Sequence, residues 1–75
     1  MQVFYASDSE YSGTMPLETL IGDFNENDGW YARHNETDMR DELNSRGWYE
    51  GLHVGGRYLV LNLDKLQLQQ NGLRL

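Results

Sequence analysis

The strongest hydrophobic pattern in the chain lies between residues 17 and 24. Four apolar side chains recur there at positions i, i+3, i+4 and i+7, namely Leu17, Leu20, Ile21 and Phe24. This spacing puts all four on one side of an α-helix, so the segment predicts an amphipathic helix with a buried stripe. Pro16 suits the first position of that helix, because the N–H that proline lacks would have no helical partner there.

A second, more polar helix is predicted further along the chain. It should start near Thr37, whose hydroxyl makes it a suitable N-cap. Met39 and Leu43 are four residues apart and give this helix a narrow apolar stripe. Arg46 falls in the last turn, and Gly47 stands just beyond it, where helices commonly end in a residue of left-handed conformation.

Three segments carry the pattern of β-strands. Residues 2–7 alternate and are rich in residues that favour strands. Residues 48–54 and 57–63 have a similar composition and flank Gly55-Gly56. Two glycines between such segments predict a hairpin turn in which both take positive φ angles.

The last of these strands is apolar on both sides. Leu59, Leu61 and Leu63 point one way along an extended chain. Tyr58 and Val60 point the other way. A strand of this kind is usually central in its sheet or covered by a partner, and we expect one of these two situations here.

The remaining segments are predicted to be connections. Residues 8–14 have turn chemistry, and residues 25–29 form a polar loop. Residues 30–34 are interpreted as a short strand or extended segment. None of these stretches marks a domain boundary, so the chain is expected to form one unit.

The C-terminal segment admits two interpretations. Asp64 is a suitable cap for a short helix that reaches Gln70. Alternatively, the segment continues as a strand and turns at Asn71-Gly72. Either way, residues 1–75 predict a single small α+β domain, in which a small antiparallel sheet has two helices packed on one face. Its strands are the N-terminal strand and the C-terminal Gly-Gly hairpin.

Charge is distributed unevenly along the chain. The net charge is −6, and the region from Asp8 to Glu42 holds ten acidic and two basic residues, while the rest holds two acidic and four basic ones. An acidic region of this kind repels phosphate backbones and attracts basic surfaces. Cysteine is absent, which excludes disulfides and fits the reducing cytoplasm, the expected location.

No catalytic or cofactor motif stands out. Asp23, Asn25 and Asn27 alternate like the first ligands of a calcium loop, but the glycine and the final glutamate of such a loop are not in register. His34 and His53 lack the i, i+4 spacing of helical zinc ligands. Nucleophile motifs and phosphate-binding glycine loops are also missing. We therefore expect no metal, no cofactor and no enzymatic activity.

The succession of two helices and a hairpin also resembles a winged helix-turn-helix. In that fold the second helix reads DNA, and here it would carry Asp38, Asp41 and Glu42. Phosphates would repel these three carboxylates, so direct binding to nucleic acid is not expected. A regulator of this type remains the alternative function, together with a self-associating accessory subunit.

Two pairs of adjacent aromatic residues, Trp30-Tyr31 and Trp48-Tyr49, are of the types enriched at binding hot spots. Neighbours in an extended chain point to opposite faces. At least one aromatic side chain of each pair is therefore predicted to be partly exposed.

The overall profile is similar to that of small acidic phage-type inhibitors, including anti-CRISPR and DNA-mimic proteins, and the similarity is one of composition. The resemblance implies a cytoplasmic protein that binds a partner protein with a basic, nucleic-acid-handling surface and inhibits or modulates it. A homodimer is compatible with this profile, and a membrane association is not expected. The predicted partner-binding residues are Asp23, Glu26, Asp28, Trp30, Tyr31, Glu36, Asp38, Asp41 and Glu42.

Overall fold

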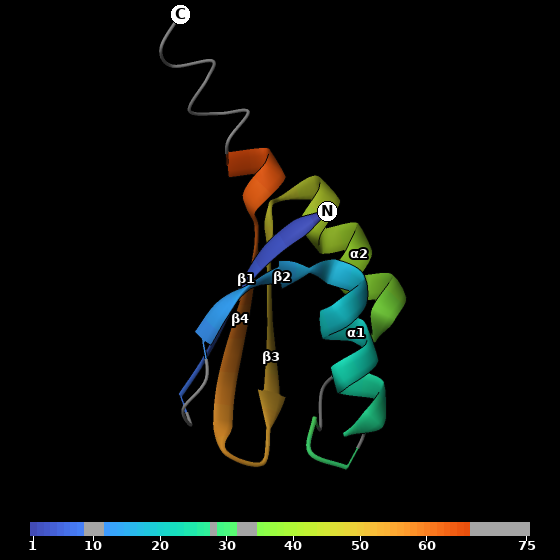
Figure 1. Ribbon diagram of the computed structural model, residues 1–75, viewed down its shortest axis with the longest axis vertical. Coiled ribbons are helices and arrows are strands. Elements are labelled where there is room, and N and C mark those ends of the chain that lie inside the picture. Colours follow the sequence, from blue (N-terminus) through green and yellow to red (C-terminus); the bar gives the residue numbers. More distant parts are fainter. Residues whose placement is uncertain (9–11, 28, 32–34, 67–75) are drawn as a thin grey trace, which may run out of the picture.

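The computed structural model describes residues 1–8, 12–27, 29–31 and 35–66. The elements, in chain order, are β1 (Gln2–Ser7), β2 (Ser12–Pro16), α1 (Leu17–Glu26), α2 (Glu36–Ser45), β3 (Trp48–His53) and β4 (Gly56–Asn62). The four strands form one antiparallel sheet in the order β2-β1-β4-β3, and both helices lie on one side of it (Figure 1). This arrangement confirms the predicted α+β fold.

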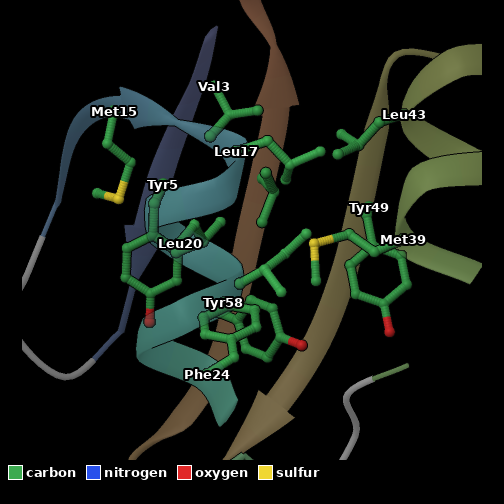
Figure 2. Packing of buried hydrophobic residues seen from close by; sticks show 12 residues of the cluster. Val3, Tyr5, Met15, Leu17, Leu20, Phe24, Met39, Leu43, Tyr49 and Tyr58 are labelled. Carbon is green, nitrogen blue, oxygen red and sulfur yellow. The ribbon is translucent and has the colours of Figure 1, made fainter. Parts of the chain in front are cut away.

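A single hydrophobic core fills the space between the helices and the sheet (Figure 2). The helix α1 contributes the four residues of its predicted stripe, and α2 contributes Met39 and Leu43. The strands contribute every second side chain, as expected of a sheet with one covered face. The buried hydrophobic strand residues are Val3, Tyr5, Met15, Tyr49, Tyr58 and Val60.

The strand β4 is central in the sheet. Its apolar residues on both faces had predicted either this position or cover by a partner. It pairs with β1 on one side and with β3 on the other. Val60 lies opposite Tyr5 in β1 and opposite Tyr49 in β3, so three inward-facing side chains form one row across the sheet. This row forms the part of the core on which the helices pack.

The edge strand β2 was not predicted, because its residues have turn chemistry. Its pairing with β1 places Met15 opposite Val3 and buries it, so tertiary pairing overrides the weak local preference. Pro16 ends β2 with a ψ of 143° and caps α1 from outside. The prediction that Pro16 is the first helical residue is therefore wrong by one position, since an extended ψ does not belong to a helix.

The ends of the helices also differ from prediction. The helix α2 begins after Asn35, whose side-chain oxygen accepts the N–H of Asp38 at 3.0 Å, and Thr37 lies inside the helix. The amide of Asn35 thus provides the N-cap contact assigned to Thr37. The helix α1 extends to Glu26 and includes the start of the predicted loop at 25–29.

Part of the predicted extended segment at 30–34 is described. Trp30 is in a turn, where its N–H donates to the carbonyl of Asn27 at 2.8 Å, and Tyr31 follows outside any strand. Residues 32–34 lie outside the described residues. The described part of this segment is therefore a turn that follows α1 rather than a strand.

The hairpin between β3 and β4 turns one residue earlier than predicted. Its turn is formed by Val54-Gly55, and His53 pairs with Gly56. Of the two glycines, only Gly56 has a positive φ, at 128°, so the prediction is wrong for Gly55. Gly47 has a φ of 91°, which confirms the predicted left-handed end of α2.

A short helical turn at residues 63–66 follows β4. Its cap is Asn62, whose side-chain oxygen accepts the N–H of Lys65 at 3.1 Å, whereas the sequence had suggested Asp64. The continuation of the predicted helix to Gln70, and the alternative turn at Asn71-Gly72, lie outside the described residues. The same Asn62 side chain donates to the carbonyl of Leu43 at 3.0 Å and so ties this turn to α2.

A close approach between β3 and β4 explains the glycine at position 51. Gly51 pairs with Tyr58, and the Tyr58 ring crosses the inner face of the sheet where a Cβ of residue 51 would lie. The ring is 1% exposed and is held by the rings of Phe24 and Tyr5, so it has no free space to move into. Glycine is therefore required at this position by packing rather than by backbone conformation.

We predict that Gly51→Ala lowers the free energy of unfolding by about 1–3 kcal/mol, the usual cost of overpacking a core. Gly22→Ala is the matched control, because Gly22 is exposed on α1 and nothing lies within 4 Å of a Cβ added there. The control should be neutral or more stable by up to about 1 kcal/mol. Urea titration of both variants measures the difference, and equal stability would contradict the packing of Tyr58 against Gly51.

Candidate functional site

The two helices share an acidic outer surface. Their apolar stripes face the sheet, and none of their acidic residues is among the buried residues of either helix. We call this region the acidic helical surface, and its members are Glu18, Asp23, Glu26, Glu36, Asp38, Asp41 and Glu42. All except the half-buried Glu42 are exposed. The fold therefore gathers most of the acidic residues of the first half of the sequence on one layer.

Two arginines neutralise only part of this surface. The Arg40 guanidinium bridges the helices, at 3.2 Å from Glu36 on its own helix and 3.9 Å from Glu18 on α1. Arg46 lies 3.1 Å from Glu42, in an ion-pair contact without hydrogen-bond geometry. The two Arg40 contacts are solvent-exposed and contribute little to stability, whereas the Glu42 Oε2 atom that faces Arg46 is buried.

The other four carboxylates of the acidic helical surface have no ion-pair partner within the described residues. These four are Asp23, Glu26, Asp38 and Asp41. Their charges are therefore open to solvent or to a partner. An unpaired, exposed group of like charges is the arrangement that attracts an oppositely charged surface over a distance.

The predicted aromatic contacts lie at the C-terminal end of α1. Trp30 is 42% exposed and stacks on the His53 ring at a centroid distance of 5.7 Å. Tyr31 is half-buried and packs 4.0 Å from the Phe24 ring. Trp48 is exposed while Tyr49 is buried, so the prediction that each aromatic pair exposes a side chain is confirmed.

The structure thus brings most of the predicted partner-binding residues to one side of the molecule. Eight of the nine predicted residues are described, and six of them are exposed, whereas Tyr31 and Glu42 contribute less surface because they are half-buried. The exception is Asp28, which lies outside the described residues.

A contact between Ser7 and His53 was not foreseen from the sequence. Ser7 Oγ lies 2.8 Å from His53 Nε2, although 46 residues separate them. Both residues are at the ends of their strands, and His53 is 5% exposed. The inward position of His53, two residues beyond Gly51 in β3, is the only sequence signal that could have placed it in the core.

The hydrogen bonds of His53 do not have the pattern of a serine–histidine catalytic pair. The N–H of Gly55 donates to His53 Nδ1 at 2.8 Å, so Nδ1 holds no proton in the neutral ring. The proton is then on Nε2, which donates to Ser7 Oγ. A general base for serine needs the opposite tautomer, with a free lone pair on the nitrogen that faces the hydroxyl. The pair therefore links the end of β1 to the end of β3 rather than activating Ser7.

The described part of the chain was also searched for a metal site and for a membrane-spanning helix. There, no three side chains of the kinds that bind metals come together. Neither of the described helices is long and apolar enough to cross a membrane. Comparison with protein-family models, curated proteins and solved structures found no match. The acidic helical surface is therefore interpreted from its charges and exposed side chains.

Burial raises the pKa of two tyrosines in the aromatic cluster beneath this surface. For Tyr58 the main cause is desolvation, followed by the neighbouring Tyr49, and its pKa lies well above the ordinary 10.0. For Tyr31 desolvation again dominates, and its hydroxyl lies 3.3 Å from that of Tyr5. Both hydroxyls therefore keep their protons in the folded protein at a pH where an unfolded chain would lose them.

This raised pKa predicts alkaline unfolding. Because the folded pKa exceeds the unfolded one, the contribution of these two tyrosines to stability should be constant below about pH 10 and fall as the pH rises further. Each tyrosine can contribute a slope of at most about 1.4 kcal/mol per pH unit. Urea titrations across this range measure the decline, and Tyr31→Phe should make it shallower. A stability that stays flat to high pH would contradict the buried state of both hydroxyls.

Proposed function

We propose that this protein is a non-enzymatic binding protein that docks its acidic helical surface on a basic surface of a macromolecular partner. The observation that carries the proposal is that the helical layer of the fold holds seven carboxylates. They outnumber the two arginines that lie beside them, Arg40 and Arg46. Its effect on the partner would be inhibition or modulation, because occupying a basic surface blocks whatever else that surface binds.

The distribution of ion pairs supports this proposal. Four of the seven carboxylates are unpaired among the described residues, and they occur on both helices. Carboxylates so placed steer association and set the orientation of the partner, while each contributes little alone. Trp30 adds an exposed aromatic side chain at one end of the surface, a residue type that is enriched where binding energy concentrates.

The nature of the partner follows from the same chemistry. Surfaces rich in lysine and arginine are common on proteins that handle nucleic acids, since those residues bind phosphates. An acidic protein that covers such a surface competes with the nucleic acid for it. The compositional similarity to phage-type anti-defence inhibitors points in the same direction, and we include an anti-CRISPR-like or DNA-mimic role in the proposal on that basis.

The winged-helix alternative is less favoured by the fold. The hairpin β3–β4 is part of a four-stranded sheet in which β4 is paired on both sides, so it does not project as a separate wing. The outer side of α2 carries Asp38 and Asp41 without described ion-pair partners. Such a helix would meet phosphates with net repulsion.

A double substitution tests the role of the acidic helical surface. Asp23→Asn with Asp41→Asn removes two unpaired carboxylates, one from each helix, and should leave stability nearly unchanged because both are exposed. Glu50→Gln with Asp64→Asn is the control, because it removes the same charge from outside α1 and α2. The tagged wild-type protein first identifies the partner by co-purification. Surface plasmon resonance then gives association rates.

The first variant should associate about 3- to 10-fold more slowly than wild type, and the difference should shrink as salt rises. The control should associate at close to the wild-type rate. Equal rates for wild type and the helix variant would reject the acidic helical surface as the binding site. Direct binding of the wild-type protein to a DNA or RNA duplex at physiological salt would instead favour the winged-helix alternative.

A further inference from the structure

The face of the sheet opposite the helices is apolar along both central strands. Because strand residues alternate, the neighbours of the inward-facing residues point to this second face. In β1 these are Phe4 and Ala6, and in β4 they are Leu59 and Leu61. Both described helices lie on the other side, as Figure 1 shows, so neither helix covers these four side chains.

The strand register brings these side chains together. Phe4 pairs with Leu61, which pairs in turn with Trp48, and Ala6 pairs with Leu59. Trp48 and Leu52 on the edge strand β3 are 40% and 46% exposed. We call this region the open sheet face, and its members are Phe4, Ala6, Leu59, Leu61, Trp48 and Leu52. An antiparallel sheet with a solvated face normally carries polar side chains there, which indicates that this face is covered in the functional protein.

Two opposite charges accompany the apolar residues. Glu50 and Arg57 are outward neighbours on β3 and β4, in adjacent rows, since Glu50 pairs with Leu59 and Arg57 with Leu52. Both line a shallow cavity of about 300 Å³ on this face, where the Asp8 carboxylate also lies and accepts the backbone N–H of Arg57 at 3.2 Å. Among the described residues, neither side chain has an ion-pair partner within 4.0 Å. The open sheet face therefore offers one acid and one base, Glu50 and Arg57, that no other described residue pairs.

A second copy of the chain fits these features. A two-fold interface repeats every contact, so one Glu50–Arg57 pair between copies occurs twice and pairs both Glu50 and both Arg57 side chains. Sheets that pack face to face lie about 10 Å apart, which suits interdigitating leucines and aromatic residues. The acidic helical surfaces would point outward on opposite sides, separated by both sheets and by more than the Debye length of about 8 Å at physiological salt.

We propose that the open sheet face is the interface of a homodimer of this chain, with Leu59 and Leu61 of the central strand β4 in its middle and Trp48 at one corner. Four strands about 4.8 Å apart and about six residues long give a face of roughly 400 Å² in projection. Counted on both copies this is about 800 Å², below the roughly 1,200–2,000 Å² of stable specific interfaces, so we expect a weak, reversible dimer. It uses the side opposite the acidic helical surface and is independent of the proposed function.

Sedimentation equilibrium on the full chain tests the dimer. The average mass should rise from the 8.7 kDa of one chain towards twice that value as concentration increases. Leu61→Glu should hold the protein at the monomer mass, while Val54→Glu, a control in the exposed turn outside the face, should behave as wild type. Circular dichroism establishes that both variants are folded.

A charge exchange keeps the test decisive if Leu61→Glu fails to fold. Glu50→Arg and Arg57→Glu should each abolish the dimer, because each creates like charges across the interface. An equimolar mixture of the two variants should recover it, since each arginine at 50 or 57 then faces a glutamate of the other copy.

A wild-type protein that stays monomeric into the millimolar range would overturn the proposal. Binding of a hydrophobic dye to such a monomer would show that the face is free for a different protein. A mixture of the two charge variants that remains monomeric would overturn it as well.

Discussion

The packing of Tyr58 across Gly51 is the contact on which the rest of the structure depends. It lies between the central strand and the edge strand β3, and it fixes their register because only glycine leaves room for the ring. The same ring contacts the rings of Phe24 on α1, Tyr5 on β1 and His53 at the hairpin. One buried side chain thus joins three strands and a helix, and a small domain without disulfides gains its cohesion from this aromatic cluster.

Fixing the helices on one face of the sheet divides the molecule into two chemically different sides. The stripes of α1 and α2 turn inward to meet the cluster, so their carboxylates must turn outward. The opposite side of the sheet keeps its apolar residues and a few charges of both signs, Glu50 and Arg57 among them. The molecule can therefore bind on one side through long-range electrostatics and on the other through apolar contact, and changes on one side need not disturb the other.

The sequence pattern predicted those features of the fold that depend on residues close together in the chain. The stripe of Leu17, Leu20, Ile21 and Phe24 and the end of α2 at Gly47 follow from spacing and backbone conformation, and both are found. Features that depend on distant residues were not predictable. The strand β2 exists because β1 lies beside it, and the Ser7–His53 contact joins the ends of two strands. The acidic surface was predictable as a list of charges, but its separation from the apolar sheet face became visible only through the topology.

The most direct measurement of the central claim is the proton NMR spectrum of Gly51. A tyrosine ring packed against a glycine Cα shifts its α-protons strongly upfield through the ring current. The account predicts such a shift for Gly51 in the wild-type protein, and its loss in Tyr58→Leu, with the α-protons of the exposed Gly22 as an internal reference. Gly51 α-protons at ordinary strand positions in the wild-type spectrum would contradict the arrangement from which both surfaces derive.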